Sequence, residues 1–173
     1  MQNIIEFYSG HRFAYKGKKY INLTVDISDF TVLPVGKSVF VKATGTGYEA
    51  AAIPNADSQI VELAVYTGFS ANDFDPRNPD GAAGAAADTA TDGNYIFCIQ
   101  GACNALVNGT SDVAVGDPLE ILKNTDNFVL NGTSGTVVYD IKTHAIAGEI
   151  VTADADTLAL VYLVGGKITP SAS

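Results

Sequence analysis

Alternation of apolar and polar positions, with a period of two, dominates the chain and predicts short strands. Five segments of strand length are rich in β-branched and aromatic residues and are bounded by Gly, Asn, Asp or Pro: residues 38–43, 59–66, 94–99, 136–141 and 157–164. Residues 59–66 also admit two helical turns capped by Asp57 and Ser58, but Ile, Val and Tyr there favour a strand. The pattern predicts an all-β fold: a small β-barrel or β-sandwich of short antiparallel strands, with an extended N-terminal segment and one long irregular loop.

Two Asn-Gly pairs predict tight turns between strands. Asn108-Gly109 and Asn131-Gly132 each follow an apolar pair and precede Thr-Ser. Asn and Gly both accept a positive φ, which a two-residue type I′ hairpin requires. We therefore predict two hairpins of the same type.

Composition shifts suggest four segments along the chain. We predict an N-terminal arm or first strand at 1–13, a first β-lobe at 14–69, an Ala/Gly/Asp-rich loop at 70–94 and a second β-lobe at 95–173; a single domain at 14–165 is the alternative. Loops as long as 70–94 are uncommon within compact domains. Asp73 and Asp75 offer alternating carboxylates, but the later positions of a calcium loop are not filled, so a solvated surface loop is favoured.

Composition and charge exclude several classes of protein. The 173 residues are 47% hydrophobic and 17% charged, which is a globular composition. The net charge of −9 argues against direct binding of nucleic acid, whose phosphates select basic proteins. The N-terminus does not resemble a secretion signal, and the apolar run 158–164 is far too short to cross a bilayer. We expect a soluble protein, made in the cytoplasm, with no membrane partner.

Residues for catalysis are scarce. Only two His and two Cys are present, and no nucleophile elbow, zinc-protease motif or phosphate-binding loop occurs. His144 is the best single candidate for a base, with Asp140 or Glu149 as its partner, but a lone His is usually structural. A zinc site needs four ligands, and His11 and His144 are the only histidines. We predict no enzyme activity, no cofactor and no metal.

The two cysteines are predicted to be separate buried thiols. In a regular strand, Cys98 and Cys103 would lie about 16 Å apart and on opposite faces. A disulfide requires Cα atoms within roughly 4.4–6.8 Å, so it would need a sharp turn at Gly101.

The order of segments resembles the head decoration, or capsid cement, proteins of tailed bacteriophages. The resemblance covers residues 32–66 and 113–165. In the first part, Val35-Gly36-Lys-Ser-Val-Phe-Val opens a strand, followed by 48–53 and 60–65; in the second, Val115-Gly116-Asp117-Pro118-Leu-Glu-Ile opens a strand, followed by 127–130, 145–151 and 158–164. The loop at 70–94 departs from this pattern.

This resemblance implies a structural virion protein with no catalytic residue and no cofactor. Such a protein lies on the capsid exterior, bridges neighbouring major capsid subunits and is usually a homotrimer, so the expected partners are the major capsid protein and further copies of the chain. An acidic surface would keep particles from associating. A carbohydrate- or fibre-associated β-sandwich module without catalytic activity is the alternative, although the chain has no Trp.

The N-terminal segment is the predicted interface. It is more apolar than a free terminus exposed to water should be, and an extended segment can add a strand to the open sheet edge of a neighbour. The candidate capsid or oligomer contacts are Ile4, Ile5, Phe7, Tyr8, Arg12 and Phe13. The alternative is that this segment forms the first strand of the protein's own sheet.

Overall fold

The computed structural model describes residues 12–15, 17–52, 60–75, 88–108, 112–121, 128–130, 145–152 and 156–165, and it confirms the all-β fold. The described residues form ten strands and one 3-10 turn, η1 (Ile27–Asp29). The strands are β1 (Arg12–Tyr15), β2 (Lys18–Val25), β3 (Ser38–Ala43), β4 (Tyr48–Ala51), β5 (Ile60–Ser70), β6 (Gly93–Asn108), β7 (Leu119–Ile121), β8 (Phe128–Leu130), β9 (Ala145–Ala147) and β10 (Asp156–Leu163).

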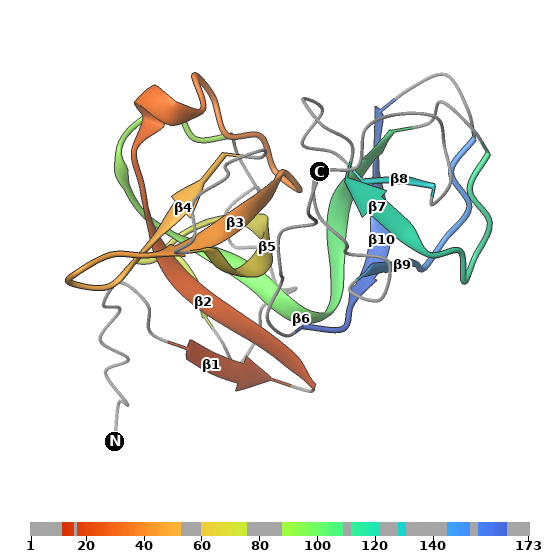
Figure 1. Cartoon of the computed structure of the whole chain (residues 1–173), viewed down its shortest axis with the longest axis horizontal. Coiled ribbons are helices and arrows are strands. Elements are labelled where there is room, and N and C mark those ends of the chain that lie inside the picture. Colours follow the sequence, from red (N-terminus) through yellow and green to blue (C-terminus); the bar gives the residue numbers. More distant parts are fainter. Residues whose placement is uncertain are drawn as a thin grey trace.

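Five strands close into a barrel (Figure 1). The order runs β2, β4, β3, β5, β6, and β6 then pairs back onto β2, antiparallel, from Lys19 opposite Gln100 to Val25 opposite Gly93. β1 pairs with residues 18–21 of β2, on the edge of β2 opposite to the one that pairs with β6. Closure gives each barrel strand two hydrogen-bonded neighbours, which removes open edges.

Apolar side chains at alternate positions of the strands fill the barrel interior. Each of the five strands turns alternate apolar side chains toward one cluster: Ile21, Leu23, Val25, Val39, Val41, Ala50, Ala64, Tyr66, Phe97 and Ile99. Leu33, which lies before β3, joins them. The pattern read from the sequence therefore sets which face of each strand is inside.

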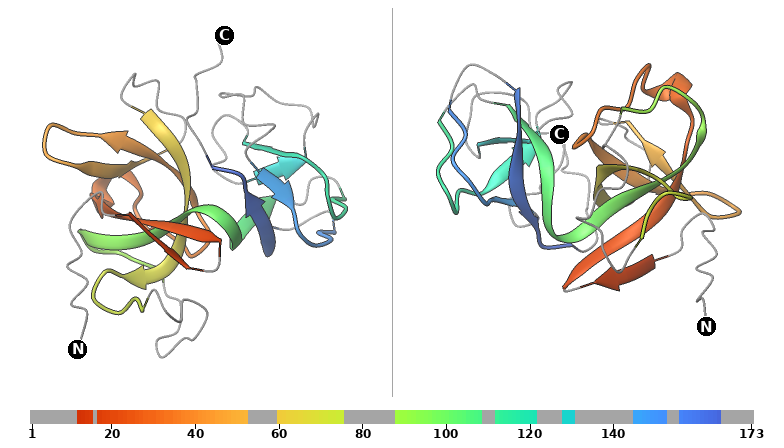
Figure 2. Two further views of the ribbon diagram at one scale, coloured as in Figure 1. Left: turned by 90° about the horizontal axis from the view of Figure 1, so that it is seen from below. Right: turned by 180° about the vertical axis from the view of Figure 1, so that it is seen from behind.

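β6 joins the barrel to a second lobe. Its first half, up to Gln100, pairs with barrel strands, whereas residues 101–108 pair with β10. Gly101 has a φ of 95°, a conformation that side chains other than glycine rarely adopt, and the strand bends where it leaves the barrel (Figure 2). The second lobe contains the sheet β6–β10–β9 and the pair β7–β8.

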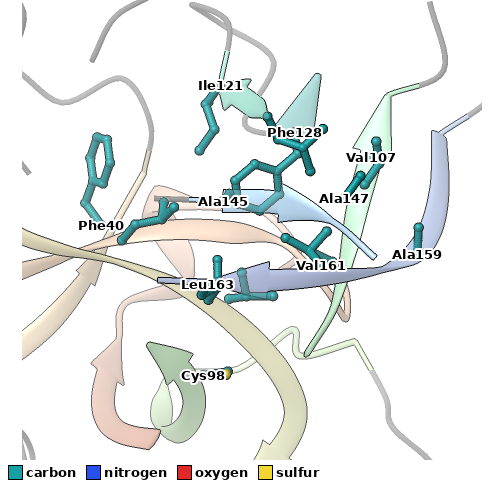
Figure 3. Packing of buried hydrophobic residues seen from close by; sticks show 14 of the residues in the cluster. Phe40, Cys98, Val107, Ile121, Phe128, Ala145, Ala147, Ala159, Val161 and Leu163 are labelled. Carbon is teal, nitrogen blue, oxygen red and sulfur yellow. The ribbon is translucent and has the colours of Figure 1, made fainter. Parts of the chain in front are cut away.

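A second core cluster spans both lobes. It combines outward barrel residues such as Phe40 and Val65 with Phe128, Val161 and Leu163 of the second lobe. Figure 3 shows part of this cluster, with Phe40 of the barrel on one side and Phe128, Val161 and Leu163 of the second lobe on the other. Burial of these side chains holds the two lobes against each other, at roughly 1.5–3 kcal/mol for each large side chain.

Four of the five predicted strands, 38–43, 59–66, 94–99 and 157–164, are confirmed in position, but most of them differ in length. β3 matches the predicted 38–43, while β5 continues to Ser70 and β6 to Asn108. Most pairs are antiparallel as predicted, but β2–β4 and β6–β8 are parallel. The predicted strand 136–141 lies outside the described residues.

The hairpin predicted at Asn108-Gly109 is wrong for the described strands. In the next described segment, Val113 bridges Val151 and Pro118 bridges Ile146 of β9, and neither residue pairs with β6. β7 then pairs with β8. Long-range pairing thus overrides the local turn preference. The turn at Asn131-Gly132 lies outside the described residues.

The loop at 70–94 is described only at its two ends. Its first residues continue from β5, and Thr89 bridges Leu33 before β6 begins at Gly93. The division into lobes at 14–69 and 95–173 stays a prediction, and β6 contributes residues to both the barrel and the second sheet.

Candidate protein-binding surface

The predicted arm is only partly described. Arg12 and Phe13 lie in β1, where they pair with Ile21 and Tyr20 of β2. This is the arrangement expected if the segment forms a strand of the protein's own sheet. Ile4, Ile5, Phe7 and Tyr8 lie outside the described residues, so a role for them at an interface stays a prediction.

A different surface emerges from the second lobe, on the outward face of the sheet β6–β10–β9. The registers place outward residues side by side: Ile146 opposite Tyr162, Tyr162 opposite Ala102, and Leu158 opposite Leu106. We call Ala102, Leu106, Ile146, Leu158, Leu160 and Tyr162 the apolar face. Asn104, opposite Leu160, is the polar residue among them.

The apolar face is open to solvent. Ile146 is 37% exposed, Leu158 45% and Tyr162 48%, whereas the residues that alternate with them, such as Ala159 and Val161, are buried. Val164, Val115 and Ile150, in the segments that adjoin β10 and β9, are also exposed. A group of large apolar side chains on one exposed face is unusual and marks sites of protein contact.

The sequence carried a signal for this face. An antiparallel sheet with one solvated side normally alternates apolar and polar residues. Residues 158–164 instead read Leu-Ala-Leu-Val-Tyr-Leu-Val, apolar at every position. Such a run predicts a strand covered on both sides, yet the described residues leave the outward side of β10 exposed at Leu158 and Tyr162.

Carboxylates border the apolar face. Asp156, at the start of β10, accepts a hydrogen bond from Asn108 Nδ2 at 2.7 Å. Glu149 Oε1 accepts one from the Leu160 amide at 2.9 Å, and Asp117 Oδ2 accepts one from the Ala114 amide at 2.8 Å. These bonds fix negative charge around an uncharged centre, which suits a partner with an apolar centre and a basic border.

Two glycines allow backbone to approach this sheet closely. A Cβ on Gly36, in the turn before β3, would overlap the Leu158 side chain, and the Gly36 carbonyl accepts a hydrogen bond from the Leu106 amide at 2.9 Å. A Cβ on Gly148 would lie 2.7 Å from Leu160 Cγ. The turn before β3 thereby packs against the Leu158 end of the apolar face.

A cleft of about 410 Å³ lies on the barrel, between the C-terminal end of β5 and the N-terminal end of β6. Tyr66, Phe69 and Tyr95 supply aromatic rings, and Asp73 and Asp88 supply carboxylates. Hydroxyl groups of Ser and Thr complete the lining, and none of the described lining residues is basic. The cleft therefore suits an uncharged or cationic ligand rather than an anion.

Internal hydrogen bonds order the walls of the cleft. The Tyr95 hydroxyl donates to the Thr91 carbonyl at 3.0 Å, and the Ser70 hydroxyl donates to Asp73 Oδ2 at 2.5 Å. Asp88 Oδ1 accepts from the Val35 amide at 3.0 Å. Burial raises the pKa of Tyr66 well above its ordinary value, and the nearby Tyr95 and Asp88 raise it further. Tyr66 is thus a neutral hydroxyl at neutral pH.

The residues considered for catalysis do not meet in the described structure. His144 and Asp140 lie outside the described residues, and Glu149 is engaged with the Leu160 backbone. Within the described ranges, no group of three or more His, Cys, Asp or Glu residues could hold a metal ion. Across the same ranges, no helix has the length and hydropathy needed to span a membrane.

The cysteines do not follow the predicted geometry. Both are free thiols, as predicted, with Cys98 buried and Cys103 partly exposed. They do not lie on opposite faces, because the bend at Gly101 turns both toward the cluster that spans the two lobes. Cys98 Sγ donates a hydrogen bond to the Gln100 carbonyl at 3.4 Å.

Comparisons with known proteins find a structural likeness and no family match. No family model matches the chain, and no curated protein matches it. The chain is similar to the N base of the head fibre gp8.5 of bacteriophage phi29, at 16% identity and a TM-score of 0.38, over 87% of this chain and 97% of that chain. At this identity and TM-score the likeness carries no argument for function.

Proposed function

We propose that this chain is a structural, non-enzymatic protein of a tailed-phage virion that binds the outer surface of the assembled capsid and bridges major capsid subunits. The proposal joins the resemblance of residues 32–66 and 113–165 to decoration proteins with one structural observation. That observation is the exposed apolar face of the second lobe, around Tyr162.

Burial of this face supplies the driving force for binding. Removing apolar surface from water contributes about 25 cal/mol per Å², and aromatic residues such as Tyr162 are frequent at the centres of interfaces. A protein that binds the assembled shell, but not its separate subunits, stabilises the shell by mass action.

The acidic border gives the partner a defined chemistry. Asp117, Glu149 and Asp156 place negative charge around the face, so the complementary capsid surface is apolar at its centre and carries Lys or Arg at its margin. Long-range attraction between these charges is screened by salt, so association slows as ionic strength rises.

Co-sedimentation with capsids assembled without this protein tests the proposal. Tyr162→Asp places a charge at the centre of the face, and we expect it to abolish binding while the far-ultraviolet circular dichroism stays unchanged. Val32→Asp is the matched control, because Val32 is a 42% exposed valine before β3 and outside the face. Binding by Tyr162→Asp at the wild-type level would overturn the proposed face.

A homotrimer is the expected form of the protein on the capsid, and sedimentation equilibrium of the purified chain measures it.

Deletion of residues 2–12 separates two further possibilities for the N-terminal segment. If it is an attachment arm, the shortened protein stays folded and no longer binds capsids; if it completes the protein's own sheet, the deletion unfolds it.

The barrel cleft favours a second candidate function, the binding of a neutral saccharide. Hydroxyls and carboxylates such as Asp73 hydrogen-bond sugar hydroxyls, while aromatic rings such as Tyr95 pack against apolar sugar faces. A glycan array probed with the purified protein tests this function. We expect Asp73→Asn to weaken any binding and Asp156→Asn, outside the cleft, to preserve it; an array with no bound glycan removes this candidate.

A further inference from the structure

The cleft on the barrel joins two segments that are far apart in the sequence, and backbone hydrogen bonds hold both of them. Its lining comes from the end of β5 and from the segment that leads into β6. Ser70 pairs with Tyr95, and Thr89 exchanges two backbone hydrogen bonds of 3.0 Å with Leu33. The cleft is therefore formed before a ligand arrives, which reduces the entropy lost on binding.

Three aromatic side chains line the cleft, and ring contacts fix their orientation. The Tyr66 and Tyr95 rings meet edge to face with centroids 5.7 Å apart, and the Phe69 ring meets that of Phe74 at 5.9 Å. Tyr66 is buried, whereas Phe69 and Tyr95 are half-buried and leave part of their surface accessible. The face of an aromatic ring packs against the C–H groups of a sugar and also attracts a cation.

Two carboxylates give the cleft a negative charge that no basic group of the described lining offsets. Asp73 Oδ2 accepts from the Ser70 hydroxyl, and Asp88 Oδ1 accepts from the Val35 amide. In the described part of the chain, no other hydrogen bond or ion pair engages these two carboxylates, so the second oxygen of each can accept from a ligand. The oriented oxygens favour a ligand that carries hydrogen-bond donors and positive charge.

We propose that the cleft binds an amino sugar, with its ammonium group on the carboxylates of Asp73 and Asp88 and its ring against the aromatic side chains. The inference rests on the second candidate function, saccharide binding in this cleft, and adds one charged group to that ligand. An amino sugar keeps the hydroxyls and the apolar ring face of a neutral sugar, and its ammonium donates several hydrogen bonds. A hydrogen bond between charged groups is roughly twice as strong as one between neutral groups. Sugars that carry a carboxylate are repelled by the same aspartates.

The size of the cleft limits the ligand to a short saccharide. Its volume of about 410 Å³ lies near the lower end of the roughly 300–1,000 Å³ that small-molecule sites enclose. Monosaccharides are therefore sufficient as probes.

Titration of the nitrogen-15-labelled protein with matched sugars, followed by NMR, tests the inference. Glucose is compared with glucosamine, and galactose with galactosamine, at about pH 6, where the amine is protonated. Each pair differs only by a hydroxyl or an ammonium group at one carbon. Amides of the lining residues 68–70 and 88–91 should shift, and in the pair that binds the amino sugar should bind about 2- to 5-fold tighter, as expected for a solvent-exposed ion pair. Added salt should reduce this advantage and leave binding of the neutral sugar unchanged.

Aspartate variants locate the charge that the ammonium contacts. Asp88→Asn should lower the ratio of the two affinities, because it removes the charge while its Oδ1 can still accept from the Val35 amide. The double variant Asp73→Asn, Asp88→Asn should bring the ratio to about one, since the described lining holds no other carboxylate. Asp112→Asn is the matched control: it removes the same charge from an exposed aspartate outside the cleft and should keep the wild-type ratio. Amide spectra of the variants without sugar check that each is folded.

The outcomes separate the amino sugar from the saccharide function on which it rests. Equal binding of both sugars of a pair at the lining residues would overturn the amino-sugar inference and retain saccharide binding. A ratio that persists in the double variant, or shifts confined to residues outside the cleft, would place the ammonium elsewhere and equally overturn the inference. No shift with any of the sugars would remove both proposals for the cleft.

Discussion

The barrel and the second lobe are both built from apolar strands, but they differ in how many of the apolar side chains are buried. The described barrel has a closed ring of strands and buries its alternate residues around Phe97, while the ion pair between Lys42 and Glu49, at 3.0 Å, lies outside this core on β3 and β4. In the second lobe, β10 is apolar on both sides: its inward side is buried, whereas Leu158 and Tyr162 on the outward side are largely exposed. The barrel thus buries its apolar residues in a closed core, whereas the second lobe leaves large apolar side chains exposed, where a partner could cover them.

Truncation inside the barrel should give the largest loss of stability. Phe97 is fully buried and its ring centroid lies 5.4 Å from that of Tyr66. Phe97→Ala should lower the free energy of unfolding by about 3–5 kcal/mol, because apolar contacts are lost and a cavity remains. Urea unfolding followed by circular dichroism measures this change.

The same experiment tests whether the lobes are energetically joined. Because one core cluster spans both, Phe97→Ala and Phe128→Ala should each shift one common unfolding transition. Two separate transitions, each moved by only one of the variants, would show instead that the lobes unfold independently.

The junction between the lobes should be the next most sensitive position. Gly101→Ala forces a Cβ into a positive φ, which costs about 1–2 kcal/mol, and also against the Lys18 backbone. Gly17→Ala is the control: Gly17 also has a positive φ, of 80°, but a Cβ there meets nothing within 4 Å. Thermal unfolding should show the larger loss for Gly101→Ala, and equal losses would mean that the close packing does not matter.

High pH should weaken the barrel through Tyr66. Its pKa in the folded protein is raised above the ordinary 10.0, so folding favours the neutral hydroxyl. The contribution is fully present below the unfolded pKa and is lost as pH rises through the range between the unfolded and folded values. Tyr66→Phe should therefore flatten the alkaline part of the stability profile measured by urea unfolding at stepped pH.

The sequence predicts the barrel better than the second lobe, for a physical reason. Alternation at 38–43 sets both the strand and its inward face, because one side chain in two must enter a closed barrel. The isolated bridges of Val113 with Val151 and of Pro118 with Ile146, by contrast, depend on partners far along the chain. Local turn chemistry at Asn108-Gly109 predicts a hairpin that this long-range pairing replaces.

The candidate site was harder still to predict. An apolar run such as 158–164 shows that β10 needs cover on both sides, but not that one side stays open at Tyr162. Cys98 and Cys103 face the same core cluster because the strand bends at Gly101, and the conformation of Gly101 cannot be read from residue types alone.

A polar substitution on the apolar face should have the smallest effect on stability. Tyr162 is 48% exposed, so folding gains little from its outer surface, and Tyr162→Ser should change the free energy of unfolding by no more than about 0.5 kcal/mol. Chemical unfolding of the isolated protein measures this, with Val161→Ser, buried on the adjacent position of β10, as the contrasting variant. A loss for Tyr162→Ser comparable to that for Val161→Ser would mean that the face contributes to folding, and the division between a stabilising barrel and a binding lobe would then fail.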